Sequence, residues 1–433
     1  MHLDRRKFLI QSGVTAAAAL AVSGQAGLKP LAVETDPWKL VRAQFDQLDP
    51  RQIHLSSFFL VSHPRPVREA IEKHRRAIDE NPIDYLEKNM FEMPGRIQAA
   101  VADYLGGKPD EIAVTNSTTM GLALVYHGLP LKAGQEILTT DHDHFVHHES
   151  IRLAAEHAGA VVRKIALFND IKTVSETEIL ERIGRAITPK TRVVGVTWVH
   201  SSTGLKLPIR AIAGVIADRN RNRVEAERIL LVVDGVHGFG VEDEDIPAMG
   251  ADFFIAGTHK WIFGPRGTGI VWANGENWKK LRMIFPAFAI EPFTAWITGT
   301  PLTAPMRASW MTQGGFHAFE YEWALPAAFE FHKQIGRGRV AARIHSLNEQ
   351  CREGLAKLRN VKLYTPRSSK LSAGLVCFEV EGIKNADAVK RLHAKGVIAS
   401  TSPYREAYVR LAPSLLNTPE EIETTLGHVR GLT

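Results

Sequence analysis

Two ionisable residues of the 433-residue chain follow apolar runs in a way that suits amine chemistry. Asp234 ends the run ILLVVD, and Lys260 follows the next run, DFFIAGTH. A lysine that leaves an apolar strand is partly desolvated, which lowers the pKa of its amine and favours Schiff-base formation. A carboxylate at a buried strand end needs a cationic partner, and a protonated pyridine nitrogen is one. His237 in the following turn could meet the oxygen substituent of the same ring.

A second segment offers groups for a phosphate. In EIAVTNSTTMGLALVYHG a strand run passes into a helical pattern through Ser117, Thr118 and Thr119. Hydroxyls and free backbone N–H groups at the positive end of a helix form a good seat for a dianionic phosphate. A plain helix cap uses the same residue types, so the segment alone leaves both interpretations open.

Four histidines, His142, His144, His147 and His148, follow the strand run QEILTT. His144 and His148 stand four residues apart, which places two imidazoles on one helical face. A metal-dependent enzyme or metal-binding protein that uses this cluster is therefore a second hypothesis.

Seven short apolar runs must position these groups, and amphipathic stretches separate several of them. The runs are EIAVT, QEILTT, AVVRKIAL, RVVGVTWV, ILLVVD, DFFIAGT and TGIVWA. Near-continuous apolar strands are typical of a mostly parallel sheet that is covered on both faces. Such α/β sheets bind ligands at the carboxyl ends of their strands, where Asp234 stands.

The character of the chain changes near residue 300, where a Pro- and Thr-rich passage leads into long helical patterns. Strand runs return at GLVCFEVEG and YVRLAP, and a last helix begins with the capping box Thr418–Glu421. These patterns predict a linker and N-terminal arm over 27–60, a large domain over 61–300 and a smaller α+β domain over 301–433.

The text DGVHGFG…GTHKWIFGPRGTG resembles the cofactor-lysine signature of the class V aminotransferase family, and matching segments follow in order across roughly residues 50–430. The resemblance implies fold type I, a large domain with a mostly parallel seven-stranded sheet, and pyridoxal 5'-phosphate (PLP) as cofactor. Lys260 would form the internal aldimine and shuttle protons. Asp234 would bind the pyridine nitrogen, and His237 the ring oxygen.

The same resemblance implies further cofactor contacts. His144 takes the position of the residue that stacks on the pyridine face. The other residues expected to contact the cofactor are Ser117, Thr118, Thr119, Thr258, His259 and Thr300. Thr300, in ITGTPLTAP, would cross the interface of a homodimer to the partner's phosphate, so the two subunits would share their active sites.

Arg410, in YVRLAPSLLNTPEEI, matches the arginine that grips the substrate α-carboxylate through a bidentate fork. A salt bridge to a nearby acid is the alternative role for this arginine. Ser201 and Ser202 stand where the family has an Asn or similar polar group, which leaves that contact unassigned.

The text resembles most closely the isopenicillin N epimerase-like group, within which epimerase, lyase and transaminase chemistry all stay open. The loop segment GVIASTSPYREAY contains no cysteine that could carry a persulfide, which argues against desulfuration. Epimerisation requires a second acid besides Lys260, and the sequence does not identify it.

Residues 1–26 resemble a twin-arginine export signal, with Arg5 and Arg6 before a weakly apolar Ala-rich run and a small-x-Ala cleavage pattern. They predict a periplasmic or otherwise exported protein with no membrane span in the mature chain. The net charge of +6 is too mild to indicate nucleic-acid binding. Cys351 and Cys377 could pair, but two inert buried thiols are the favoured interpretation.

Overall fold

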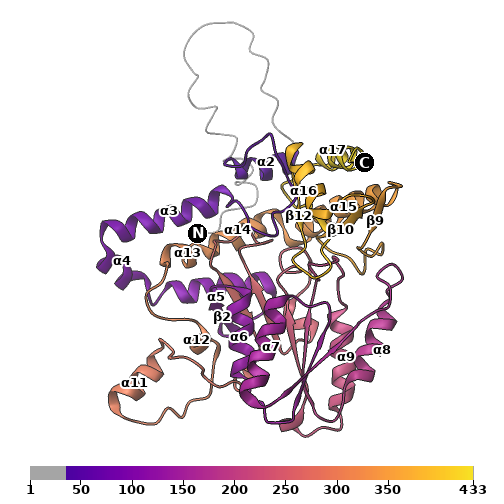
Figure 1. The fold of residues 1–433 in the computed structure, drawn as a ribbon. Coiled ribbons are helices and arrows are strands. Elements are labelled where there is room, and N and C mark those ends of the chain that lie inside the picture. The colour runs from indigo at the N-terminus through magenta and orange to yellow at the C-terminus, as the bar shows by residue number, and fades with distance from the viewer. Residues whose placement is uncertain (1–35, 433) are drawn as a thin grey trace, which may run out of the picture.

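The computed structural model describes residues 36–432, and Figure 1 shows how they are arranged. A seven-stranded sheet of order β2-β8-β7-β6-β5-β3-β4 forms its larger part. Its strands are β2 Ile112–Thr115, β3 Glu136–Thr140, β4 Val161–Ile165, β5 Thr191–Thr197, β6 Leu230–Asp234, β7 Phe253–Gly257 and β8 Gly269–Trp272. Only β8 runs antiparallel to its neighbours in this sheet. The predicted fold, with all seven apolar runs as strands of a mostly parallel sheet, is confirmed.

The strands are apolar throughout because helices cover both faces of the sheet. In β6, Leu230 and Val232 enter one hydrophobic core, whereas Leu231 and Val233 enter the core on the opposite face. The helices around the sheet are α3 Arg65–Glu80, α4 Pro82–Asn89, α5 Met93–Leu105, α6 Thr118–Gly128, α7 Phe145–Ala158, α8 Glu176–Ala186, α9 Ile209–Asn220 and α10 Gly275–Trp278. Residues of α6 and α7 belong to the first core, and residues of α5, α8 and α9 to the second.

The C-terminal part of the chain forms a smaller unit, which lies at the top of Figure 1. Its four-stranded antiparallel sheet has the order β12-β13-β10-β9. The elements are α15 Arg337–Ala356, β9 Val361–Leu363, β10 Val376–Val380, α16 Asn385–Ala394, β11 Val397–Ile398, β12 Ser400–Thr401, β13 Val409–Leu411 and α17 Pro419–Arg430. Thr418 caps α17 and forms the predicted capping box with Glu421.

The N-terminal arm crosses between the two units. It comprises α2 Pro37–Arg42, the short helix η1 Ala43–Phe45 and β1 Ile53–His54. β1 pairs in parallel with β11, so the arm is joined to the small unit by backbone hydrogen bonds. The remaining short helical turns are η2 Pro109–Glu111, η3 Glu225–Glu227 and η4 Ile246–Met249.

Four helices lie between α10 and α15: α11 Ile290–Thr298, α12 Ala308–Met311, α13 Phe319–Glu322 and α14 Leu325–Ile335. α12 packs on β2, and α13 and α14 pack on α3 and α5. The chain therefore returns to the large unit after residue 300, and it passes to the small unit at Gly336, whose φ of +100° separates α14 from α15. The domain boundaries proposed from the sequence stay predictions.

Both cysteines are buried and free. Cys351 lies in the core of the small unit with Val376 and Phe378, whereas Cys377, between those two residues, points to the opposite face of the strand. Burial raises the pKa of each thiol to about 12. No helix in residues 36–432 is long and apolar enough to cross a membrane. The predicted export signal lies outside the described residues.

Candidate active site

Asp234 and Lys260 lie at the carboxyl edge of the large sheet. Asp234 is the last residue of β6. Lys260 lies three residues beyond the end of β7, and β7 is the parallel neighbour of β6. Asp234 is only 2% exposed, and its Oδ1 accepts a hydrogen bond from the Val236 N–H at 3.1 Å. The Lys260 Nζ lies 3.3 Å from His237 Nε2. The structure thus brings the three predicted residues together.

The burial of this edge sets its electrostatics. Desolvation lowers the pKa of Lys260 to about 8, in spite of the Asp234 charge, which acts in the opposite direction. Desolvation also raises the pKa of Asp234, and the positive groups around it, Lys260 among them, oppose that rise. The neutral amine, which is the form that attacks a carbonyl carbon, is therefore far more abundant near neutral pH than in an ordinary lysine.

The His237 imidazole directs an N–H group toward Lys260. The Trp261 Nε1–H donates to His237 Nδ1 at 3.3 Å, so the neutral imidazole carries its proton on Nε2, toward Lys260. Burial, and then the charge of Lys260, lower the pKa of His237 well below its usual range. His237 is therefore a neutral donor, suited to an oxygen atom of a bound ring.

The start of α6 lies beside this pair. The Thr118 hydroxyl accepts a hydrogen bond from the N–H of Gly257, the last residue of β7, at 2.8 Å. A side chain at Gly257 would press on Thr118 and on His259, so these two residues are close neighbours. Ser117 caps the helix through a bond from Met120 N–H at 3.1 Å. Among the described residues, the N–H groups of Thr118 and Thr119 have no acceptor, as an anion site requires.

Thr258 and His259 directly precede Lys260, but their side chains make different contacts. The Thr258 hydroxyl is fully buried and lies 2.5 Å from the Thr268 hydroxyl, which donates to the Pro265 carbonyl. The Thr258 hydroxyl therefore stabilises the Gly-rich turn after Lys260, and its contact with the cofactor stays a prediction. The half-buried His259 donates from Nδ1 to the Thr268 carbonyl at 3.1 Å, which leaves its Nε2 for another partner.

The histidines after β3 have separate partners. His142 Nε2 accepts from Leu167 N–H, His144 Nδ1 accepts from Val146 N–H, and His148 Nε2 donates to the Thr140 carbonyl. His147 lies 2.7 Å from the Tyr126 hydroxyl. In the part of the chain that the structure describes, no three His, Cys, Asp or Glu side chains converge as metal ligands. The metal hypothesis is therefore not supported.

His144 caps α7 and lies near the positive groups of the site. Burial, followed by the charges of Lys260 and Arg410, lowers its pKa to about 4, so the ring is neutral. A neutral, half-buried imidazole at the start of a helix is a suitable surface for an aromatic ring.

Arg410 reaches the site from β13 of the small sheet. It is 3% exposed, and its two terminal nitrogens donate to the Ser201 carbonyl at 3.2 Å and the Thr401 carbonyl at 2.9 Å. Its Nε has no partner, and no acid among the described residues lies within ion-pair distance. The alternative of a structural salt bridge is therefore wrong. A buried guanidinium that lacks an anion is suited to bind one from a ligand.

Two residues that the sequence did not indicate complete the surroundings. Phe58 of the N-terminal arm lies under the Arg410 guanidinium at 4.6 Å and against the His237 ring at 5.7 Å. Tyr404 bonds to the Ser201 hydroxyl at 2.8 Å and stands edge-on to His144 at 5.8 Å. An aromatic pair in a polar arm, SSFF, was the available signal for Phe58. Ser201 thus contacts the site through Tyr404 and Arg410.

Thr300 lies apart from these residues within one chain. It follows α11, is exposed, and its hydroxyl bonds to Thr298 at 2.8 Å. Figure 1 shows α11 standing away from the body of the molecule. The structure describes one subunit, so a contact from Thr300 to a partner's site stays a prediction.

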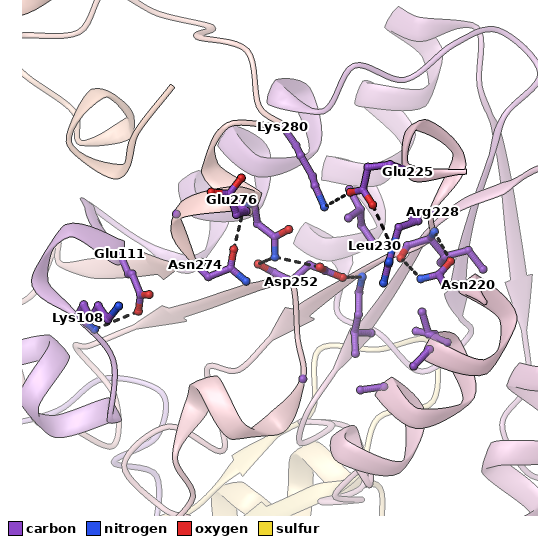
Figure 2. A pocket seen from close by; sticks show the side chains of 18 of the residues that line it. Lys108, Glu111, Asn220, Glu225, Arg228, Leu230, Asp252, Asn274, Glu276 and Lys280 are labelled. Atoms are coloured by element: carbon purple, nitrogen blue, oxygen red, sulfur yellow. Dashed lines mark hydrogen bonds and ion pairs between the residues drawn. The ribbon is translucent and has the colours of Figure 1, made fainter. Parts of the chain in front are cut away.

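A cavity of about 610 Å³ lies at the opposite edge of the sheet (Figure 2). It is lined by the beginning of β6 and by Asp252, which precedes β7. Several of its charges have partners: Lys280 pairs with Glu225 at 3.2 Å, and Asp252 accepts from Leu231 N–H at 2.8 Å. We therefore place the chemistry at the carboxyl edge, where the charges of Lys260 and Arg410 lack such partners.

A buried lysine with a lowered pKa, a buried carboxylate at the next strand end and a free helix terminus on a mostly parallel sheet define a fold type I PLP-dependent enzyme. Residues 63–403 match the family model described as aminotransferase class-V, so the chain belongs to that family. The predicted family and cofactor are confirmed.

Similar proteins agree with this membership. The chain is 25% identical to isopenicillin N epimerase of Streptomyces clavuligerus, over 92% of this chain and 98% of that protein. It is 23% identical to a probable cysteine desulfurase of Vibrio cholerae, over 76% of this chain and 80% of that protein. A solved structure of C-DES with glycine covalently linked to its PLP cofactor superposes with a TM-score of 0.80 at 21% identity, over 90% of this chain and 99% of that one.

The residues present fit the cofactor. Asp234 is a buried carboxylate, Arg410 is a buried cation whose Nε has no partner, and the N–H groups of Thr118 and Thr119 are free. PLP would supply an aldehyde for Lys260, a pyridine nitrogen for Asp234 and a phosphate for the start of α6.

Proposed function

We propose that the chain is a PLP-dependent epimerase that inverts the Cα of an amino acid. The proposal rests on one observation: the desolvated Lys260 lies in the same site as Arg410, a buried arginine that has no acidic partner among the described residues. The arginine would hold the carboxylate of an amino acid while the lysine acts on its Cα. Similarity to an isopenicillin N epimerase over 92% of the chain supports inversion as one of the reactions open to this family.

Each residue has one proposed role. Lys260 anchors the cofactor and moves the Cα proton, Asp234 holds the pyridine nitrogen, and His237 donates to the ring oxygen. Ser117, Thr118, Thr119 and His259 surround the phosphate, and His144 covers the ring face. When bound, PLP supplies a protonated ring that accepts the electron pair of the broken Cα–H bond.

Desulfuration requires a thiolate at the site, and the chain has two cysteines. Cys351 is in the core of the small unit, and Cys377 is fully buried beside Arg410, its partner across the strands β10 and β13. With a pKa of about 12, neither thiol is a nucleophile at neutral pH. This supports chemistry that uses Lys260 alone or with an oxygen acid.

A homodimer is part of the proposal. Large apolar side chains are exposed on and around α11: Phe288, Ile290, Phe293, Trp296 and Ile297, each more than half exposed. Apolar area of this kind commonly marks a subunit interface. A second copy seated there would cover these side chains and bring its neighbour's Thr300 to an active site. Sedimentation of the purified protein tests this assembly.

The reaction is tested by incubating the holoenzyme in D₂O with a panel of L- and D-amino acids and with isopenicillin N, followed by chiral chromatography and NMR. The expected result is formation of the other configuration with deuterium at Cα and no keto acid. Accumulation of a keto acid would indicate transamination, and loss of a side-chain fragment would indicate a lyase; either refutes epimerisation. Lys260→Ala should abolish the absorbance of covalently bound cofactor.

We further propose export by the twin-arginine route, on the basis of residues 1–26. Replacing Arg5 and Arg6 together with lysine should retain the full-length precursor in the cytoplasm of a twin-arginine-competent host. An unchanged periplasmic fraction would contradict this assignment.

A further inference from the structure

The loop Ser402–Tyr408 holds one phenol at the active site. The Ser402 N–H donates to the Tyr408 carbonyl at 2.9 Å, and the Tyr408 N–H donates to the Ser402 hydroxyl at 2.8 Å, so the loop is closed at its base. Asn385 of α16 donates to the Ala407 carbonyl at 2.6 Å and ties the loop to the small unit. Tyr404 is therefore carried on a braced loop.

The phenol lies beside the arginine proposed to hold the substrate. The Tyr404 hydroxyl is 2.8 Å from the Ser201 hydroxyl, and the backbone carbonyl of Ser201 accepts from Arg410. Tyr404 and Arg410 thus share one residue as partner. A carboxylate bound by Arg410 would bring its Cα into the neighbourhood of the phenol.

The phenol also lies on the side of His144. The two rings meet edge to face, 5.8 Å apart at 80°. With His144 covering one face of the cofactor ring, as proposed, the Lys260 amine would act from the other face. Tyr404 therefore approaches the substrate from the face opposite to the lysine, where inversion needs a second acid.

We propose that Tyr404 is this second acid, an inference that rests on the proposed epimerase function. On one face the Lys260 amine takes the proton of the Cα–H bond and becomes an ammonium, while the bonding electron pair passes to the cofactor ring. On the other face the Tyr404 O–H bond breaks, its proton bonds to Cα with the returned electron pair, and the phenol becomes a phenolate. Proton exchange with water restores both groups.

The surroundings suit a proton donor. Burial raises the pKa of the Tyr404 phenol, so the proton is present at neutral pH, and burial lowers the pKa of Lys260, so the free amine is present on the other face. The Ser201 hydroxyl can donate to the phenolate as it forms, and the positive charge of Arg410 stabilises it.

The test compares Tyr404→Phe with the matched control Tyr408→Phe, which removes a hydroxyl bonded to Glu406 in the same loop. Both holoenzymes are incubated in D₂O with a mixture of the common L-amino acids, and NMR follows deuterium at Cα while chiral chromatography follows inversion. For Tyr404→Phe we expect inversion to fall about 100-fold or more, the scale of a lost general acid, with exchange that retains configuration within about 3-fold of wild type. Tyr408→Phe should behave as wild type.

Binding provides a readout that needs no turnover. A 2-methyl amino acid, 2-aminoisobutyrate, has no Cα–H, and its effect on the cofactor absorbance should give the same Kd, within about 2-fold, in both variants and wild type. Inversion unchanged in Tyr404→Phe, or exchange lost together with inversion, would overturn the role of Tyr404. Exchange without inversion in the wild-type enzyme would instead overturn the epimerase function, and the role of Tyr404 with it.

Discussion

Replacement of Arg410 by methionine tests whether this buried cation serves the substrate or the fold. Methionine has a similar length and no charge. In the protein without substrate, the change removes two hydrogen bonds to carbonyl groups, at a cost of about 1 kcal/mol each. It also removes a buried charge without an acidic partner, and replacing buried ionic groups by apolar ones is often neutral or stabilising by about 1–4 kcal/mol. The free energy of unfolding should therefore change by less than about 2 kcal/mol.

The effect on catalysis should be much larger. Loss of one partner of a desolvated charge pair costs about 2–5 kcal/mol, which corresponds to a fall in kcat/KM of about 30-fold to several thousand-fold. Arg410→Lys keeps the charge but lacks the planar fork, so it should fall between methionine and wild type.

The assay compares an amino acid with its amide, which has no carboxylate. Wild type should exchange the Cα proton of the acid far faster than that of the amide, and Arg410→Met should treat the two alike. Urea unfolding of each variant gives the free energy of unfolding in parallel. The reasoning fails if the methionine variant keeps its preference for the acid, or if it loses more than about 3 kcal/mol of stability while retaining activity.

Three further predictions concern the cofactor and the sheet edge. PLP should attach to the apo-protein faster as pH rises, levelling off above about pH 8 because only the neutral Lys260 amine reacts; stopped-flow absorbance, with Nα-acetyl-lysine as reference, checks this. Thr118→Val, which removes the acceptor of the Gly257 N–H, should weaken cofactor affinity about 10-fold in equilibrium dialysis. Asp143→Asn should destabilise the fold by about 3–5 kcal/mol near neutral pH in urea unfolding. Burial raises the pKa of Asp143, but interactions with His147 and Thr197 outweigh it and hold this pKa well below its ordinary range. The Asp143 carboxylate therefore contributes its full stabilisation above about pH 4 and loses it in stronger acid. The free energy of unfolding of Asp143→Asn should depend less on pH than that of wild type in that acid range.

The sequence predicted the parts of the site that depend on local pattern. Asp234 and Lys260 end apolar strands, and a buried parallel sheet brings neighbouring strand ends to one edge whatever the loops do. Phe58 and Tyr404 come from an arm and a loop with no periodic pattern, and only the packing of the small unit on the large one places them. Thr258 shows a related limit, because the direction of a side chain just beyond a strand depends on the turn that follows.

Four histidines that follow β3 and β5 lie near the site without adding positive charge to it. Burial is the main cause that lowers the pKa values of His142, His144, His148 and His200, so these imidazoles are neutral near neutral pH. They surround a carboxylate, Asp143, that is already saturated by hydrogen bonds from Thr139, Thr140 and Thr197. These four imidazoles therefore add bulk and polar contacts without adding cations. Lys260 and Arg410 are therefore the positive groups available to a substrate. An amino acid requires both, because the lysine amine acts as a base at Cα and the arginine binds the carboxylate.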